Sequence, residues 1–200
     1  MRRPYSRWFT CGSIIYPVQL GLMTQSIPAS DPLEVRIGYL LKQSGLKLAV
    51  AESCTGGLVC DRITDVPGSS AYFIGGVVPY AYEAKLKLLG IPWDSLQAHG
   101  AVDRETVLAM ARQVRHTLQT DLGLSVSGIA GPAGGMPGKP VGLTWIGLSA
   151  PDGEWARVFI WAGDRLQNKA SSAQAALRLL DDYLQGERSL EMDDRAGRGE

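Results

Sequence analysis

The stretch Ala49–Asp65 places small nucleophilic side chains where an apolar segment ends and a helical pattern begins. Ser53 and Cys54 follow Glu52, and Thr55 and two glycines complete the sequence ESCTGG. A strand that turns into a helix presents unpaired backbone N–H groups and the positive end of the helix dipole. The pattern predicts a nucleophile beside hydrogen-bond donors, although a capped helix with a glycine turn would look the same.

Ser53 and Cys54 are alternatives, because adjacent side chains at a strand end point in opposite directions. The thiol is the stronger nucleophile, whereas a serine needs a base. The segment YAYEAK offers Lys85, since burial lowers a lysine pKa until the amine can accept a proton. Tyr80 in the same segment could relay or donate a proton. The alternative is a solvated lysine on an amphipathic helix.

The stretch SGIAGPAGGMPGKPVG holds six glycines and three prolines between two predicted strands. Exposed N–H groups in such loops bind anions, phosphates above all. The loop matches neither the Walker A sequence nor the dinucleotide fingerprint, but its length favours a function over a plain connection. The residues expected to line this site are Ser127, Gly128, Gly131, Gly134 and Gly135.

The two histidines offer a third kind of base. A Ser–His–Asp triad would have to use His99, in a predicted turn, or His116, among polar neighbours of a predicted helix. The neighbours indicate a structural His99 and a surface His116. No Cys/His cluster has zinc-ligand spacing, so no metal is expected.

Residues 31–184 are predicted to form a single three-layer α/β domain, a mixed sheet with helices on both faces. Asp31, Asp103 and Asp164 suit helix N-caps, and Pro32 suits a first helical position. Leu46–Glu52 reads as a buried strand, and Pro151-Asp152-Gly153 indicates a hairpin. The other strands are expected at 70–81, 122–128, 143–150 and 155–162, and the other helices at 55–64, 82–90 and 92–96.

Composition excludes several classes of protein. The chain has 20 basic and 20 acidic residues, so no nucleic-acid partner is indicated. Three cysteines without paired spacing fit a reducing cytoplasm. No apolar stretch is long enough to span a membrane. Residues 1–30 are expected to be a poorly ordered extension, with a signal peptide as the alternative and Met23 as a possible start, and 185–200 a disordered tail.

Five segments in order resemble the CinA C-terminal domain family, whose stand-alone members include nicotinamide-nucleotide amidohydrolase. They are AESCTGG, DVPGSSAYFIGGVVPYAYEAKLKLLG, HGAVD, GIAGPAGGMPGKPVG and GDR, and the resemblance covers roughly residues 31–184. It implies hydrolysis of the carboxamide of nicotinamide mononucleotide to nicotinate mononucleotide and ammonia. It also implies no metal or organic cofactor, and a homodimer.

The resemblance assigns roles to particular residues. Ser53 would attack the amide carbon, and Lys85, through Tyr80, would take its proton. Ser127 matches the hydroxyl residue before the glycine-rich loop. Backbone N–H groups of Thr55, Gly56 and Gly57 would stabilise the oxyanion, Glu52 would hold Lys85 or the ribose, and Gly128 to Gly135 would hold the phosphate.

Some positions depart from the family's pattern, most clearly Tyr82, where the family often has Asn. Ser127 and Met136 stand where Thr is usual, and Lys169 stands where Arg is common. Tyr82 is expected to alter the pocket. Two alternatives follow: a catalytically silent domain that binds a phosphate ligand, and an amidase for another small carboxamide.

Overall fold

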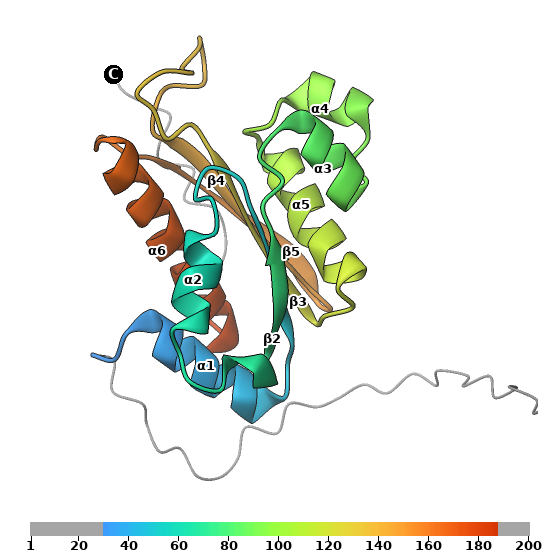
Figure 1. Cartoon of the computed structure of the whole chain (residues 1–200), viewed down its shortest axis with the longest axis vertical. Helices are drawn as coiled ribbons and strands as arrows, with labels where there is room; N and C mark the ends of the chain where they lie inside the picture. The colour runs from blue at the N-terminus through green and yellow to red at the C-terminus, as the bar shows by residue number, and fades with distance from the viewer. Residues whose placement is uncertain (1–29, 188–200) are drawn as a thin grey trace, which may run out of the picture.

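The computed structural model describes residues 30–187 and shows an open five-stranded sheet between two groups of helices (Figure 1). The strand order is β2-β1-β3-β4-β5. β2, β1 and β3 are parallel, whereas β4 is antiparallel to β3 and β5 to β4. The strands are β1 (Leu48–Glu52), β2 (Phe73–Val77), β3 (Leu122–Gly128), β4 (Leu143–Ala150) and β5 (Gly153–Ile160). The predicted α/β class and mixed sheet are confirmed.

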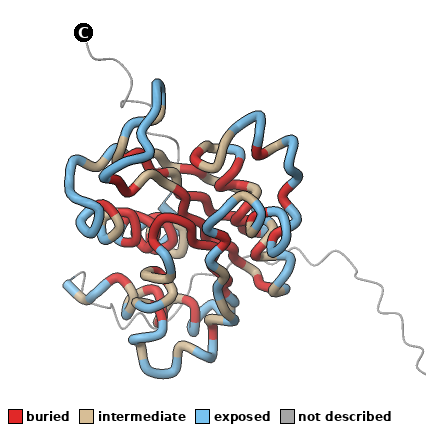
Figure 2. The backbone as a smooth tube through the Cα atoms, turned by 45° about the horizontal axis from the view of Figure 1, so that its top comes forward, coloured by how far each residue is buried: buried red, intermediate tan, exposed pale blue. Residues whose placement is uncertain are grey.

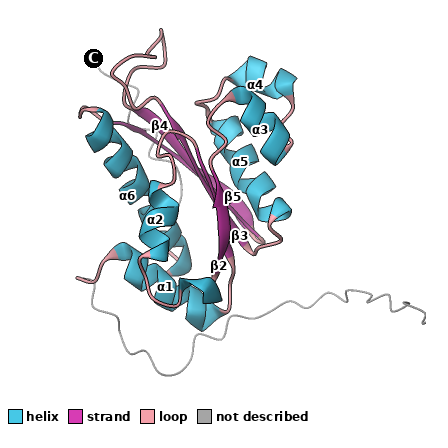
Figure 3. Ribbon diagram, viewed as in Figure 1, coloured by secondary structure: helices cyan, strands magenta, loops and turns pink. Residues whose placement is uncertain are grey.

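Helices cover both faces of the sheet, and Figure 3 shows the three layers edge-on. One face carries α1 (Leu33–Ser44), α2 (Leu58–Thr64) and α6 (Arg165–Leu184). The other carries α3 (Tyr82–Leu89), α4 (Trp93–His99) and α5 (Arg104–Thr117). A short 3₁₀ turn, η1 (Ser69–Ala71), precedes β2. The expected extension and tail lie outside the described residues, apart from residues 30 and 185–187.

The core follows the alternation of side chains along the strands. In β1, Val50 packs with α1, α2 and α6, whereas Ala49 and Ala51 pack with α3, α4 and α5. Every residue of β1 is buried, as its apolar run predicts. Figure 2 shows the buried backbone concentrated in the central sheet. None of the described helices is long and apolar enough to cross a lipid bilayer.

Two of the three predicted helix caps are confirmed. The Asp103 side chain accepts from Glu105 N–H, and Asp164 forms a capping box with Gln167. The Asp31 cap is wrong. α1 begins at Leu33 with Pro32 at the N-cap and no side-chain cap, so Pro32 lies one position earlier than expected.

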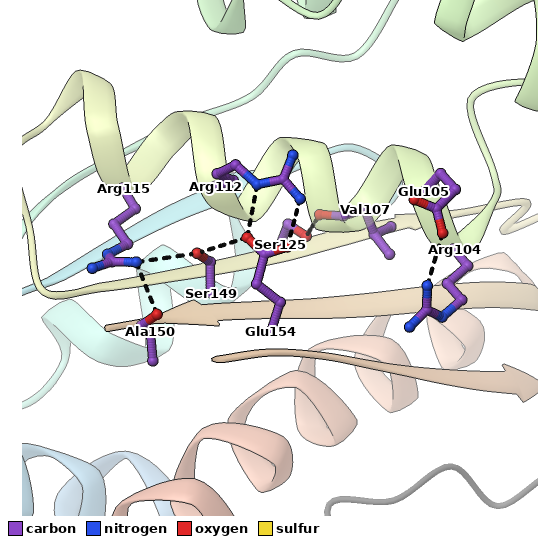
Figure 4. Close-up of polar contacts among 9 residues, drawn as sticks. All are labelled: Arg104, Glu105, Val107, Arg112, Arg115, Ser125, Ser149, Ala150 and Glu154. Carbon is purple, nitrogen blue, oxygen red and sulfur yellow. Dashed lines mark hydrogen bonds and ion pairs between the residues drawn. The ribbon is translucent and has the colours of Figure 1, made fainter. Parts of the chain in front are cut away.

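Helix α5 is fastened to the antiparallel half of the sheet by polar contacts (Figure 4). Arg112 makes two hydrogen bonds to Glu154 on β5, at 2.8 and 2.5 Å. Arg115 donates to the Ala150 carbonyl at 2.9 Å, and Ser125 Oγ donates to the Val107 carbonyl at 2.6 Å. The charged groups of Figure 4 therefore fix α5 rather than form a reaction site.

Strand β2 is shorter than expected and is closely approached at its glycines. A Cβ added at Gly76 would lie 2.3 Å from Cys60 Sγ on α2, so only glycine fits there. β2 ends at Val77, and the backbone after it turns so that the Pro79 carbonyl accepts a hydrogen bond from Lys85. The early end of β2 thus supplies part of the site.

Candidate active site

The parallel strands deliver their carboxyl ends to one edge of the sheet. The connection from β1 to β2 contains α2 on one face, and the connection from β2 to β3 contains α3, α4 and α5 on the other. Ligands of open α/β sheets bind where the connections diverge in this way, beyond the carboxyl ends of the strands. Here that position lies between β1 and β3. Ser53 follows β1, and the glycine-rich loop follows β3 at the top of Figure 1.

Ser53 and Lys85 meet at this edge although 32 residues separate them. Lys85 Nζ lies 3.2 Å from Ser53 Oγ, and it donates to the carbonyls of Pro79 at 2.8 Å and Tyr80 at 3.3 Å. A neutral amine has two hydrogens for the carbonyls and a lone pair for the Ser53 hydroxyl proton. The geometry is that of a nucleophile and its base.

Burial lowers the pKa of the Lys85 amine toward the range in which it can accept a proton. Its side chain is completely buried, although it begins near the surface turn of α3. Loss of hydration lowers the pKa of Lys85 from 10.5 to about 8, with a small opposing effect from Cys54. Near neutral pH an appreciable fraction of the amine is therefore uncharged and able to accept a proton. The alternative of a solvated lysine is excluded.

The two candidate nucleophiles lie in different surroundings. Cys54 belongs to the core cluster under α6, on the side of the sheet away from Lys85. Burial raises the pKa of Cys54 to about 12, so the thiol stays protonated at neutral pH. Ser53, which is 7 % exposed, is the side chain within reach of the base.

Glu52 has a structural role that differs from the expected one. Its carboxylate accepts hydrogen bonds from the backbone N–H groups of Gly57 at 2.9 Å, Val59 at 3.1 Å and Cys60 at 2.8 Å. The side chain points to the face opposite Ser53, because side chains alternate along β1. The expectation that it holds Lys85 is therefore wrong, because Glu52 caps the start of α2. A contact with a ribose stays a prediction.

Replacing Glu52 with Gln is expected to lower the free energy of unfolding by about 2 kcal/mol, since an amide group cannot accept all three N–H groups and leaves a buried donor unsatisfied. Urea unfolding followed by circular dichroism would measure the change. Glu83→Gln, on the exposed first turn of α3, is the matched control and should change stability by less than about 0.5 kcal/mol. Equal stability of the two variants would contradict the capping role.

The backbone N–H groups of the two glycines in ESCTGG already donate hydrogen bonds within the protein, contrary to the expectation from the sequence. Gly57 N–H is held by Glu52, and Gly56 N–H donates to the Ser53 carbonyl at 3.2 Å. Both glycines adopt positive φ, which makes the tight turn possible. Thr55 is different: its hydroxyl is buried and has no hydrogen-bond partner among the described residues. Thr55 is therefore the residue of this turn whose side-chain hydroxyl still lacks a hydrogen-bond partner.

Tyr80 contacts the base through its backbone and not through its phenol. Its side chain is exposed, and Tyr80 Oη accepts a hydrogen bond from Arg165 at 3.0 Å. Because Lys85 reaches Ser53 directly, no phenol is needed between them. Arg165 also donates to the Gly131 carbonyl at 2.7 Å and so links the β2–α3 turn to the glycine-rich loop.

The glycine-rich loop is tied to the start of α6. Asn168, which is buried, donates to the Ala130 carbonyl at 3.1 Å and accepts from Gly163 N–H at 3.0 Å. Gly131 and Gly134 have positive φ, which the turns of the loop require. An open pocket of about 310 Å³ lies between the loop and α6, lined by Ala130, Pro132, Val141, Gly163, Asp164, Arg165 and Leu166.

Two cations of α6 flank this region, and sequence reasoning gave neither a role. Arg165 lines the pocket beside the loop. Lys169 Nζ would lie 3.7 Å from a Cβ at Gly56, and its charge acts on Cys54. The sequence signal for these two residues is the GDR segment with its Asp164 cap, because Arg165 and Lys169 occupy the first turns of the helix after that cap.

Two further residues, Ser127 and Tyr82, were expected to affect the pocket. Ser127 is fully buried, and its hydroxyl donates to the Ala101 carbonyl at 2.7 Å, so it is not presented to an open cavity. Tyr82 packs edge-on against Trp93 and accepts from Ala101 N–H. It is not among the residues that line the pocket beside α6, and its effect on the fit of a substrate stays a prediction.

The histidines do not join the site. His99 Nδ1, at the end of α4, lies 3.7 Å from Asp103, the N-cap of α5, and His116 is exposed on α5. Neither hydrogen-bonds Ser53, so a histidine triad is excluded. Among residues 30–187, no group of three or more potential ligands is placed to hold a metal ion.

Comparison with known proteins gives one consistent family. Residues 30–184 match the family model described as the CinA C-terminal domain. A CinA-like protein of Chloroherpeton thalassium is 49 % identical over 157 residues, which is 76 % of this chain and 37 % of that protein. A CinA-like protein of Desulfotalea psychrophila is 44 % identical over 154 residues, 77 % of this chain and 37 % of that protein. The chain thus spans little more than a third of these relatives.

Solved structures agree. The competence/damage-inducible protein of Agrobacterium tumefaciens superposes with a TM-score of 0.73 at 35 % identity, covering 76 % of this chain and 93 % of that one. The competence damage-inducible protein A of Klebsiella pneumoniae gives a TM-score of 0.75 at 29 % identity, covering 78 % and 97 %. The arrangement of sheet and helices described above is therefore shared by these proteins.

Proposed function

Because the chain belongs to the CinA C-terminal domain family, we propose that it hydrolyses the carboxamide of nicotinamide mononucleotide to nicotinate mononucleotide and ammonia. The names of its relatives state no reaction, so the proposal depends on the side chains. The observation that carries it is the 3.2 Å contact between Ser53 Oγ and a buried lysine amine. A serine beside a neutral lysine is suited to attack on an amide carbon.

In the proposed reaction, Ser53 Oγ attacks the carboxamide carbon while its proton passes to Lys85 Nζ. The tetrahedral intermediate collapses when the resulting ammonium returns a proton to the amide nitrogen, which leaves as ammonia. The remaining ester on Ser53 is cleaved by a water whose proton Lys85 accepts. The unpartnered hydroxyl of Thr55 supports a role for this residue as a donor to the oxyanion.

The substrate's phosphate would lie between the glycine-rich loop and α6. The backbone N–H groups of Gly131, Gly134 and Gly135 make no hydrogen bond to another described residue. Arg165 and Lys169 supply positive charge on the same side. A guanidinium and free N–H groups match the oxygens of a phosphate monoester.

The homodimer also belongs to this proposal. Strand β2 lies at the edge of the sheet, and apolar side chains on it, just after it and on α3 are exposed. They are Ile74, Val78, Leu86 and Leu88. A second copy that covers this edge would remove apolar surface from water and an unpaired strand from solvent.

The test is a substrate panel read by ammonia release. We expect turnover of nicotinamide mononucleotide with a kcat/KM about a hundredfold above that of nicotinamide riboside or nicotinamide, because only the mononucleotide offers a phosphate to charged donors. Equal or better turnover of another carboxamide would favour the general amidase. Thermal stabilisation by the mononucleotide without ammonia would favour a silent binding domain.

A further inference from the structure

The backbone of Ala101 is held from two sides by groups that belong to different layers. Its N–H donates to Tyr82 Oη at 2.9 Å, and its carbonyl accepts from Ser127 Oγ at 2.7 Å. Tyr82 is the first residue of α3, and Ser127 lies near the end of β3. The backbone of one residue, Ala101, therefore joins the helix layer to the sheet.

The segment that contains Ala101 is itself well fixed. Thr106 Oγ1 donates to the Gly100 carbonyl at 2.7 Å, and Lys139 Nζ donates to the His99 carbonyl at 2.7 Å. Three consecutive carbonyls, from residue 99 to residue 101, thus accept side-chain hydrogen bonds from three different elements. Such a segment can act as an anchor, because its position does not depend on Tyr82 alone.

Each end of this connection leads to one member of the reacting pair. Lys85 lies one turn after Tyr82 on α3, and the carbonyls of Pro79 and Tyr80 that orient its amine come just before Tyr82. At the other end, Ser53 N–H donates to the Val126 carbonyl at 2.9 Å. Ser53 is therefore attached to the same strand end as Ser127.

We propose that Tyr82 is a positioning residue that fixes the distance between Lys85 and Ser53, through the backbone N–H and carbonyl of Ala101 and the hydroxyl of Ser127. The inference rests on the proposed chemistry of Ser53 and Lys85. The ring of Tyr82 helps to hold α3, since it meets Trp93 edge-on at a centroid distance of 5.9 Å. The hydroxyl is the part that connects α3 to the sheet.

A double-mutant cycle tests the connection. Tyr82→Phe keeps the ring and removes the acceptor for Ala101 N–H, and Ser127→Ala removes the donor to its carbonyl. Each is expected to lower kcat for nicotinamide mononucleotide about three- to tenfold with little change in KM, as expected for one lost hydrogen bond that affects the reacting groups and not binding. Tyr183→Phe is the matched control, because its hydroxyl bonds Asp152 at the opposite end of the sheet.

The double variant shows whether Tyr82 and Ser127 act through the same connection. If both residues act through Ala101, the Tyr82→Phe, Ser127→Ala double variant is no slower than the slower single variant. Multiplied effects would mean that the residues act independently and would overturn the proposal. So would a fall in kcat with Tyr183→Phe equal to that with Tyr82→Phe, since general destabilisation would then explain both.

A second measurement does not depend on the substrate. An NMR titration of the lysine side-chain signals, with Lys85 assigned from its absence in Lys85→Met, gives its pKa directly. Cys54 is the titratable neighbour of Lys85, and its thiol stays protonated near the Lys85 midpoint. In Tyr82→Phe, water should reach the amine and move its pKa from about 8 toward 10.5. An unchanged pKa would overturn the positioning role even if nicotinamide mononucleotide proves not to be the substrate.

Discussion

Ser53→Ala is expected to reduce ammonia release from nicotinamide mononucleotide by four to six orders of magnitude, about the loss that follows removal of a serine nucleophile. The fold should survive, because the only side-chain hydrogen bond of Ser53 in the described chain is the one with Lys85. Lys85 keeps the carbonyls of Pro79 and Tyr80 as acceptors. Turnover would be measured by an ammonia assay and folding by circular dichroism.

Cys54→Ala is the matched control, since it removes the neighbouring nucleophile with a similar change in volume. The thiol is protonated and packed under α6, so this variant should keep activity within a few-fold of the wild type. Loss of activity in Cys54→Ala with retention in Ser53→Ala would transfer the nucleophile to the thiol. A folded Ser53→Ala that retains full turnover would remove the proposed mechanism altogether.

The fold was predictable where local chemistry agrees with tertiary structure. Asp103 and Asp164 cap their helices because no other group competes for the same N–H groups. The all-apolar run of β1 predicts a strand buried on both faces, and the structure confirms it. The end of β2 was not predictable from the sequence. The residues after Val77 still favour a strand, but the Pro79 carbonyl accepts a hydrogen bond from Lys85 instead of continuing the strand.

The pairing of Ser53 with Lys85 could be predicted from the sequence, whereas the contacts that support these two residues could not. Residue chemistry offered Lys85 as a base for Ser53 and the resemblance assigned the pair, but no spacing rule joins residues so far apart. Glu52 could have been placed correctly from the sequence, since a side chain that alternates with Ser53 must face the helix that follows β1. The contacts of Ser127 and Tyr82 with Ala101 depend on how α4 and α5 are joined, which no local pattern encodes.

Lys85→Met is expected to separate catalysis from stability. Without a base, kcat should fall by two to four orders of magnitude, and Lys85→Arg should fall as far because a guanidinium stays protonated. In the wild type, kcat/KM should rise about tenfold per pH unit below pH 8 and level off above it, as Lys85 loses its proton. A rate that does not change between pH 6 and 9 would contradict the assignment of Lys85 as the base.

Lys85→Met should change stability in the opposite direction to activity. Between pH 8 and 10.5 the unfolded chain binds a proton at Lys85 that the folded chain does not, so this residue makes the free energy of unfolding rise with pH in that window. Below pH 8 the folded protein carries the cost of a buried cation. Lys85→Met should therefore melt at a higher temperature than the wild type at pH 7, with the difference shrinking as pH rises to 10.5. Lys87 is exposed on the same helix, so Lys87→Met should show no such difference in melting temperature. If Lys85→Met is not stabilised, the hydrogen bonds of the Lys85 amine fully offset the cost of burying its charge.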